Sequence, residues 1–230
     1  MVTMSERVTC FEEDPRLIKV DNLAYDIYRK GNHKAHNYDH ARWDAERAAE
    51  ISMIERPSFA TLTVAAALMH DTGASIGEYK DHGCNSGVLV RMHFPHFGYS
   101  PFEVGLIARA VEQHNQWKHT NDVSRILYDA DTLNKAGEHG IQQCNLVGEE
   151  FGLPLIRKAE RFSPYFRKLF EKGYYTDKAK EIDLRMGNER FAGLEMTVAF
   201  WEKINQLIRE GTLQEEEMMK VAKIEVGLTQ

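Results

Sequence analysis

Histidine is unevenly distributed along this chain, and the distribution marks a candidate site. Nine of the ten histidines fall within residues 33–119. Imidazole and carboxylate groups that converge from separate elements are the donors that a transition metal requires. Four such donors fall on three different predicted helices: His40, His70, Asp71 and Asp131. The residue types and their separation therefore indicate a metal site built from several helices.

The adjacent pair His70-Asp71 is informative because it stands at the predicted end of a helix. Neighbouring side chains normally point in different directions, but at the frayed end of a helix both can turn toward one centre. Gly73 follows closely and predicts a left-handed exit, because glycine adopts that conformation without steric cost. We therefore expect His70 and Asp71 to face the same site.

Apolar periodicity, together with Pro, Gly and capping residues, divides the chain into helices, and no segment shows the alternation of a strand. Asp14 before Pro15 predicts an N-cap followed by the first helical residue. Ser100 and Glu103 fit a capping box. The predicted helices cover residues 15–30, 38–54, 58–70, 81–93, 100–114, 121–131, 154–171, 177–210 and a last segment from 212. These patterns predict an all-α fold.

Composition excludes several classes of protein. With 230 residues, 43% hydrophobic and 28% charged, the chain has the composition of a globular protein that buries a substantial core. The net charge of −6 provides no basic surface for the backbone of duplex nucleic acid. Any phosphate group must therefore be bound by a few local residues.

Cysteine usage and hydropathy suggest a cytoplasmic protein. The three cysteines, Cys10, Cys84 and Cys144, are too few and too scattered for a disulfide framework. The longest apolar run, residues 64–69, is far shorter than the roughly 20 residues that span a bilayer. We therefore expect neither export nor membrane insertion.

The order of these residues resembles a known signature. His40, then His70-Asp71, then the run Tyr-Asp-Ala-Asp-Thr-Leu at residues 128–133 resemble the H…HD…D signature of the HD-domain superfamily of metal-dependent phosphohydrolases, in its DADxL-containing branch. The resemblance covers about residues 20–145. It implies an all-α HD-domain helical bundle over residues 1–150, with a helical extension over 151–230 packed on the same domain.

The resemblance also implies a set of metal ligands. Carried over to this sequence, the ligands would be His40, His70, Asp71 and Asp131. Asp131, rather than Asp129, matches the ligand aspartate of the family. In the binuclear branches two further histidines bind metal, and His82 and His114 occupy comparable places, so that Asp71 would bridge two ions. One-metal and two-metal interpretations both stay open, and such donors accept Mn, Fe, Co, Ni or Zn.

The candidate catalytic residues are Asp71 and His36. The stretch His-Asn-Tyr-Asp-His-Ala at residues 36–41 is similar to the HNxxHA stretch of cyclic-nucleotide phosphodiesterases, in which the first histidine gives a proton to the leaving group. A histidine of ordinary pKa, near 6.5, suits that role. Four cations between or beside the ligand segments are candidates for binding substrate phosphate: Lys80, Arg91, Arg109 and Lys118.

These features predict a metal-dependent phosphohydrolase that cleaves a small phosphate ester or anhydride, with a nucleotide-type substrate favoured, through a metal-activated water. Two alternatives stay open. A diiron oxygenase on the same six-ligand framework would require His82 and His114 as ligands, and a non-catalytic, ligand-sensing HD module would carry a vestigial site. The expected partner is a phosphorylated metabolite or nucleotide, and a homodimer is a reasonable expectation for the oligomeric state.

Overall fold

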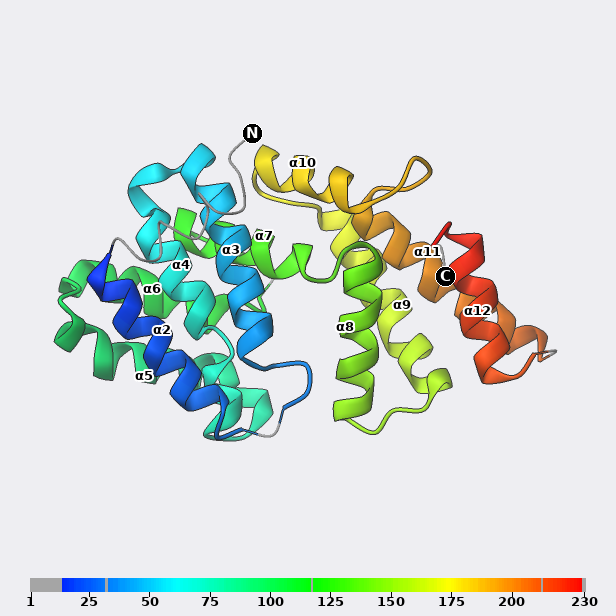
Figure 1. The fold of residues 1–230 in the computed structure, drawn as a ribbon, viewed down its shortest axis with the longest axis horizontal. Coiled ribbons are helices and arrows are strands. Elements are labelled where there is room, and N and C mark those ends of the chain that lie inside the picture. The colour runs from blue at the N-terminus through cyan, green and yellow to red at the C-terminus, as the bar shows by residue number, and fades with distance from the viewer. Residues whose placement is uncertain (1–13, 32, 117, 212, 229–230) are drawn as a thin grey trace. The chain divides into compact units, whose positions relative to one another are not determined.

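The computed structural model describes residues 14–31, 33–116, 118–211 and 213–228, so Cys10 lies outside the described residues. Within these ranges the chain forms eleven α-helices and no strand (Figure 1). The predicted all-α class is therefore confirmed. Every helix in these ranges is too short or too polar to cross a membrane.

The chain divides into two compact units, residues 1–131 and 132–230. The first contains six α-helices, of which the last runs two residues past the division, and three short 3₁₀ turns. The α-helices are α2 (Pro15–Tyr28), α3 (Tyr38–Glu55), α4 (Ala60–Met69), α5 (His82–Phe97), α6 (Pro101–Gln113) and α7 (Asp122–Leu133). The 3₁₀ turns are η1 (Pro57–Phe59), η2 (Thr72–Ser75) and η3 (Tyr79–Asp81).

Local capping explains where several of these helices begin. The Asp14 side chain accepts a hydrogen bond from the backbone of Arg16 at the start of α2. Ser100 and Glu103 form the predicted capping box of α6. Asn37 caps α3 by accepting from the backbone nitrogen of His40 at 3.0 Å, which fixes the first turn of that helix.

Helix α4 is the centre of the first unit. It packs against α2, α3 and α6, and residues 62–69 are all buried. A helix that is apolar on every side belongs in the interior of a domain. Figure 1 shows α4 between its neighbouring helices. Because α4 runs through the interior, the residues that follow it, His70 and Asp71, are buried as well.

The predicted left-handed exit at Gly73 is wrong. Gly73 does not have a positive φ, and the chain continues into the 3₁₀ turn η2. Glycine is required there for space instead, because a Cβ atom would collide with the backbone of His82 and Ser86 at the start of α5. The Gly73 nitrogen also donates to the Ser86 hydroxyl at 2.7 Å. Gly73 thus allows α5 to begin close to the end of α4.

The second unit is built around α11 (Gly193–Glu210), which packs against the other helices of this unit. These are α8 (Gly137–Glu150), α9 (Leu155–Lys172), α10 (Asp177–Met186) and α12 (Glu215–Glu225). Trp201 and Phe200 of α11 are fully buried, and the Trp201 ring contacts that of Phe162 with centroids 5.0 Å apart. The assignment of residues 1–150 to one functional domain and 151–230 to an extension stays a prediction.

Three expectations for the second unit differ from the structure. Helix α8 has no counterpart among the predicted helices, and the expected helix over 177–210 is two helices. The break comes at Gly187, where a Cβ atom would collide with the backbone of Phe191 and Ala192. The last helix begins later than expected, because Gln214 and Glu217 form its capping box.

We predict that Gly73→Ala destabilises the protein by about 1–3 kcal/mol, the usual cost of forcing an extra group into a packed interior. The new Cβ atom would meet backbone atoms of His82 and Ser86, which cannot rotate away. Urea unfolding followed by circular dichroism measures the change. Gly105→Ala in α6 is the control, because its Cβ atom would meet nothing within 4 Å and should leave stability equal or higher. Equal stability of the two variants would contradict the packing role of Gly73.

Candidate metal centre

Four histidines of the first unit bring their Nε2 atoms together in the interior. They are His40 in the first turn of α3, His70 directly after α4, His82 at the start of α5 and His114 directly after α6. All four are buried. The Nε2 atoms of His40 and His70 lie 3.2 Å apart, and those of His82 and His114 lie 3.1 Å apart. The ends of four helices therefore meet at one place.

Three of these rings are held by the same local contact. The Nδ1 atoms of His70, His82 and His114 each lie against the carbonyl oxygen three residues earlier, at 2.7, 2.5 and 2.6 Å. A carbonyl only accepts, so each Nδ1 carries the proton that it donates. In a neutral ring the lone pair is then on Nε2, which faces the cluster. This is the tautomer that binds a metal through Nε2.

Asp71 stands between the two pairs of histidines. Its Oδ2 atom lies 3.4 Å from His40 Nε2 and 3.3 Å from His70 Nε2. Its Oδ1 atom lies 3.1 Å from His82 Nε2 and 3.2 Å from His114 Nε2. One carboxylate thus faces two separate sets of imidazole nitrogens. This is the arrangement that a bridging carboxylate between two metal ions needs.

Two sets of donor atoms in the described residues are close enough to hold an ion. In each set the donor atoms all lie within 4.8 Å of one another. The first set is His40, Asp44, His70 and Asp131, and the second is His70, Asp71 and His114. Asp131, from the C-terminal part of α7, belongs to the first set, whereas Asp129 belongs to neither. All six ligand candidates from the sequence lie in this cluster, and their roles as ligands stay a prediction.

Asp44 is a member of the cluster that sequence analysis missed. Its side chain is 0% exposed, and its Oδ2 atom lies 3.3 Å from His40 Nε2 and 3.5 Å from His70 Nε2. The signal was present, because residues four apart on a helix share a face, and Asp44 follows His40 by four. The spacing gains meaning only once His40 is known to face the interior.

The acidic and basic groups of the cluster shift one another's pKa values. Burial lowers the pKa of His70, but the negative charges of Asp71, Asp44 and Asp131 outweigh burial and raise this pKa to about 10. Burial also opposes ionisation of Asp71, yet the surrounding histidines hold the pKa of that carboxyl well below its usual range. Burial is the main cause of the lowered pKa of His114. Buried carboxylates in this arrangement need a positive charge beside them, which protons or a metal ion can supply.

Tyr28 of α2 is a second residue that sequence analysis missed. It is buried, and its hydroxyl lies beside the backbone of Asp71. Burial raises the pKa of this phenol well above its usual value, and the charges of Asp71 and Asp44 raise it further. The hydroxyl therefore lies in the negative field of the cluster and stays protonated. No feature of the sequence distinguishes Tyr28 from the apolar residues of the same helix face.

His36, the candidate proton donor, lies beside the cluster. Its ring centroid is 6.1 Å from that of His40, and its Nε2 atom lies 2.7 Å from the Tyr79 hydroxyl. Tyr79 was not expected at the site. Its ring also stacks on His82, with centroids 4.8 Å apart, so it joins His36 to the second pair of histidines. His36 and Tyr79 are both only partly buried.

The four candidate phosphate-binding cations lie elsewhere on the surface. Lys80 forms an exposed ion pair with Glu78 at 2.9 Å, and Arg91 forms two hydrogen bonds to the carboxylate of Glu112. Lys118 is exposed. In the described part of the chain, neither these three nor Arg109 has a hydrogen bond or ion pair to a residue of the cluster. Their role in binding substrate stays a prediction.

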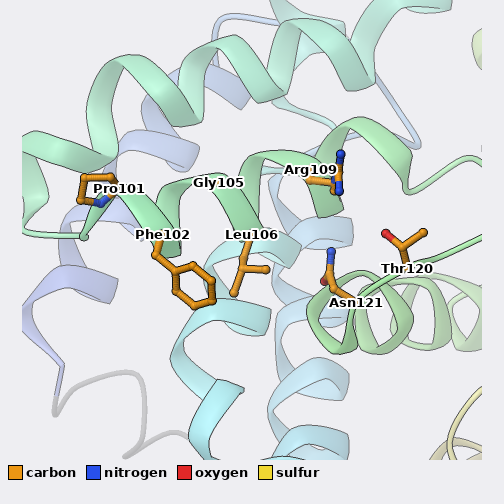
Figure 2. Close-up of a pocket in the computed structure, with 7 residues that line it drawn as sticks. All are labelled: Pro101, Phe102, Gly105, Leu106, Arg109, Thr120 and Asn121. Atoms are coloured by element: carbon orange, nitrogen blue, oxygen red, sulfur yellow. The ribbon is translucent and has the colours of Figure 1, made fainter.

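Arg109 lines a pocket of about 440 Å³ on the outer face of α6. Phe102, Leu106 and Arg109 follow one another along that face, and Asn121 lies opposite Arg109 (Figure 2). The lining residues include none of the His/Asp cluster. The pocket is therefore a feature separate from the candidate metal centre.

Comparison with known proteins supports the fold. No protein-family model matches the chain, and no curated protein matches it. A predicted HD superfamily hydrolase from an uncultured Thermotogales bacterium matches with a TM-score of 0.54 and 24% identity, over 72% of this chain and 98% of that one. Bacillus subtilis YpgQ, in complex with ADP, matches with a TM-score of 0.59 and 17% identity, over 85% of this chain and 92% of that one. A Lactobacillus plantarum protein matches with a TM-score of 0.62 and 14% identity, over 92% and 98%. The chain therefore has the fold of a predicted HD superfamily hydrolase.

We predict that the affinity for a divalent metal rises with pH. Without metal, His70 holds a proton up to a pKa of about 10, and a metal ion binding at Nε2 must displace it. The apparent affinity should therefore rise by up to about tenfold per pH unit for each proton displaced. Titration with Mn²⁺ in a competing chelator at pH 6.5, 7.5 and 8.5 measures the slope.

The matched control for this titration is His96→Ala, which removes an exposed histidine of α5. It should give the same slope as the unmodified protein, whereas His70→Ala should reduce both slope and affinity. An affinity that is the same at pH 6.5 and 8.5 would contradict displacement of a proton from the cluster.

Proposed function

We propose that the chain is a metal-dependent phosphohydrolase that cleaves a small phosphate ester or anhydride, with a nucleotide-type substrate. The observation that carries the proposal is the position of Asp71, whose two oxygens each face a separate pair of imidazole nitrogens at 3.1–3.4 Å. The shared fold with a predicted HD superfamily hydrolase supports the class of enzyme. The complex of the similarly folded YpgQ with ADP supports a nucleotide-type substrate.

The donor chemistry of the cluster fits divalent metal ions. His40, His70 and Asp131, whose donor atoms lie within 4.8 Å of one another, would hold one ion together with Asp71, and Asp71 with His82 and His114 would hold a second. Such ions supply a Lewis acid for phosphoryl oxygens and a water whose pKa is lowered toward 7. Imidazole and carboxylate together accept Mn, Fe, Co, Ni or Zn. The protein contributes rings whose tautomer is fixed in advance and a buried setting that strengthens their interaction with charge.

His36 and Tyr79 would handle the proton that the leaving group needs. His36 lies beside His40 but is only partly buried, so it can reach a substrate bound over the cluster. The 2.7 Å contact with the Tyr79 hydroxyl fixes the orientation of the imidazole. A positioned imidazole can then protonate the departing oxygen. We assign His36 as the general acid and Tyr79 as a positioning residue.

A diiron oxygenase is the second candidate function, and one observation favours it. That activity requires His82 and His114 in addition to the other four ligands, and both Nε2 atoms lie within 3.2 Å of Asp71 Oδ1. A ligand-sensing module without activity would be expected to lack some donors, whereas all six candidates lie together. The metal that is bound separates the hydrolase from the oxygenase.

We expect two metal ions per chain in protein purified without chelators, falling to one in the double variant His82→Ala, His114→Ala. The reason is that this variant removes both imidazole donors that face Asp71 Oδ1. Elemental analysis by mass spectrometry measures the stoichiometry. The same preparations are then assayed for phosphate release from ADP, nucleoside triphosphates and p-nitrophenyl phosphate.

The outcomes of this experiment distinguish the candidates. Phosphate release that requires Mn²⁺, Co²⁺ or another divalent ion supports the hydrolase. Bound iron with oxygen consumption and no phosphate release would favour the oxygenase instead. Protein that binds no metal under any of these conditions would overturn the proposed function. The variant His93→Ala, outside the cluster, is the control and should keep two ions per chain.

We also expect His36→Gln to lower kcat by about 10²–10⁴-fold on a nucleoside monophosphate, whose ester oxygen leaves as an alkoxide that needs a proton; this is the usual range for loss of a general acid. The loss should be much smaller on p-nitrophenyl phosphate, because nitrophenolate leaves without protonation. Tyr79→Phe should lower kcat only a fewfold, as expected for loss of about 1 kcal/mol from one hydrogen bond. Steady-state kinetics on both substrates test this. Equal losses on both substrates would exclude His36 as the proton donor.

A further inference from the structure

Asp44 is a buried acidic residue that contacts the cluster but is not among the six ligand candidates. It lies in the second turn of α3, is 0% exposed, and directs its Oδ2 atom at His40 Nε2 and His70 Nε2 at 3.3 and 3.5 Å. These are the same nitrogen atoms that face Asp71 Oδ2. Asp44 of α3 and Asp71, which follows α4, therefore face the same two nitrogen atoms.

A neutral His70 cannot donate a hydrogen bond to Asp44. His70 already donates its Nδ1 proton to the Ala67 carbonyl, so in the neutral ring its Nε2 atom carries a lone pair. A lone pair and a carboxylate oxygen at 3.5 Å repel each other in a buried setting unless a positive charge lies with them. A proton on His70 or a divalent ion can supply that charge. The donor atoms of His40, His70, Asp44 and Asp131 all lie within 4.8 Å of one another, which is the grouping that a divalent ion requires.

We propose that Asp44 is a metal ligand, a third carboxylate at the position defined by His40 and His70. This inference rests on the proposed function, which supplies the metal. The donor atoms of His40, His70, Asp44 and Asp131 lie within 4.8 Å of one another, and Asp71 Oδ2 faces the same two nitrogen atoms. With Asp44, that position would therefore have two nitrogen donors and three oxygen donors. The position beside His82 and His114 has two nitrogen donors and one oxygen donor, from Asp71. The two positions therefore differ in chemistry.

This difference predicts separate roles for the two positions. Carboxylate oxygens favour hard ions such as Mn²⁺, so the oxygen-rich position should select Mn²⁺ or Fe²⁺ over softer ions. Five protein donors leave little space in its coordination shell for other ligands. The ion at the position with three protein donors would keep open coordination positions. Open coordination positions are typical of the ion that binds water or substrate in a catalytic site.

Asp44→Asn tests the proposal, because it keeps the size of the side chain and removes its charge. Asp39→Asn is the matched control, since Asp39 is an exposed carboxylate in the first turn of the same helix. Mn²⁺ affinity is measured by chelator competition, and the Co²⁺ absorption spectrum reports the number and type of ligands. We expect Asp44→Asn to weaken the tighter Mn²⁺ site at least about 10-fold, since even loss of an outer partner costs that much. The Co²⁺ bands should change in intensity, and Asp39→Asn should change neither.

Each outcome bears on a different statement. Weaker Mn²⁺ binding with an unchanged Co²⁺ spectrum would overturn direct ligation and make Asp44 a positioning residue. Unchanged Mn²⁺ affinity would overturn the proposal while leaving the proposed function standing. Unmodified protein that binds no metal would overturn the proposed function itself. Asp44→Glu, which keeps a carboxylate, should recover part of the affinity, and it supplies the same measurements if Asp44→Asn does not fold.

Discussion

The architecture of the first unit depends on how a buried carboxylate is neutralised. Asp71 is 3% exposed and faces four imidazole nitrogens, two on each of its oxygens. A charge in the interior is tolerated only when partners surround it, and the partners here come from four helices. Helix α4 brings the carboxylate to the interior because its own surface is apolar on every side. The helices around α4 must then each place a donor atom beside the Asp71 carboxylate.

The donor residues are placed beside Asp71 because they stand at the ends of helices. His70 and His114 stand directly after α4 and α6, where the last carbonyl groups of a helix lack intrahelical partners, and each ring donates to one of these carbonyls. The same hydrogen bond that satisfies the carbonyl also sets the tautomer of the ring. His82 makes the equivalent contact with the 3₁₀ turn η3, and its approach to Asp71 depends on the missing side chain at Gly73. Local backbone chemistry and the candidate site are therefore parts of one arrangement.

Oxygen and nitrogen donors are distributed unevenly over the candidate metal centre. Oxygen donors gather around His40 and His70, where Asp44 and Asp131 join Asp71, whereas nitrogen donors dominate around His82 and His114. His36 and Tyr79 lie on the partly exposed side, and Tyr79 contacts both His36 and His82. A substrate that approached from solvent would meet His36 beside His40 and Tyr79 beside His82. In the proposed function, these two side chains carry the proton transfer.

The sequence by itself determined the helical class and most of the capping, because periodicity and the residues at helix ends are local properties. For His40, His70, Asp71 and Asp131 it offered a shared site only as an expectation, through the resemblance of their order to a family signature. Only the tertiary structure brought Asp44, Tyr28 and Tyr79 to the same place. Asp44 occupies a helix position whose meaning depends on which face is buried, and Tyr79 belongs to a short turn without periodicity. The packing role of Gly73 could not be predicted from the sequence either, because its neighbours in space are residues of α5 that no local pattern places beside it. Contacts between distant segments arise from packing, and packing is decided by the whole unit.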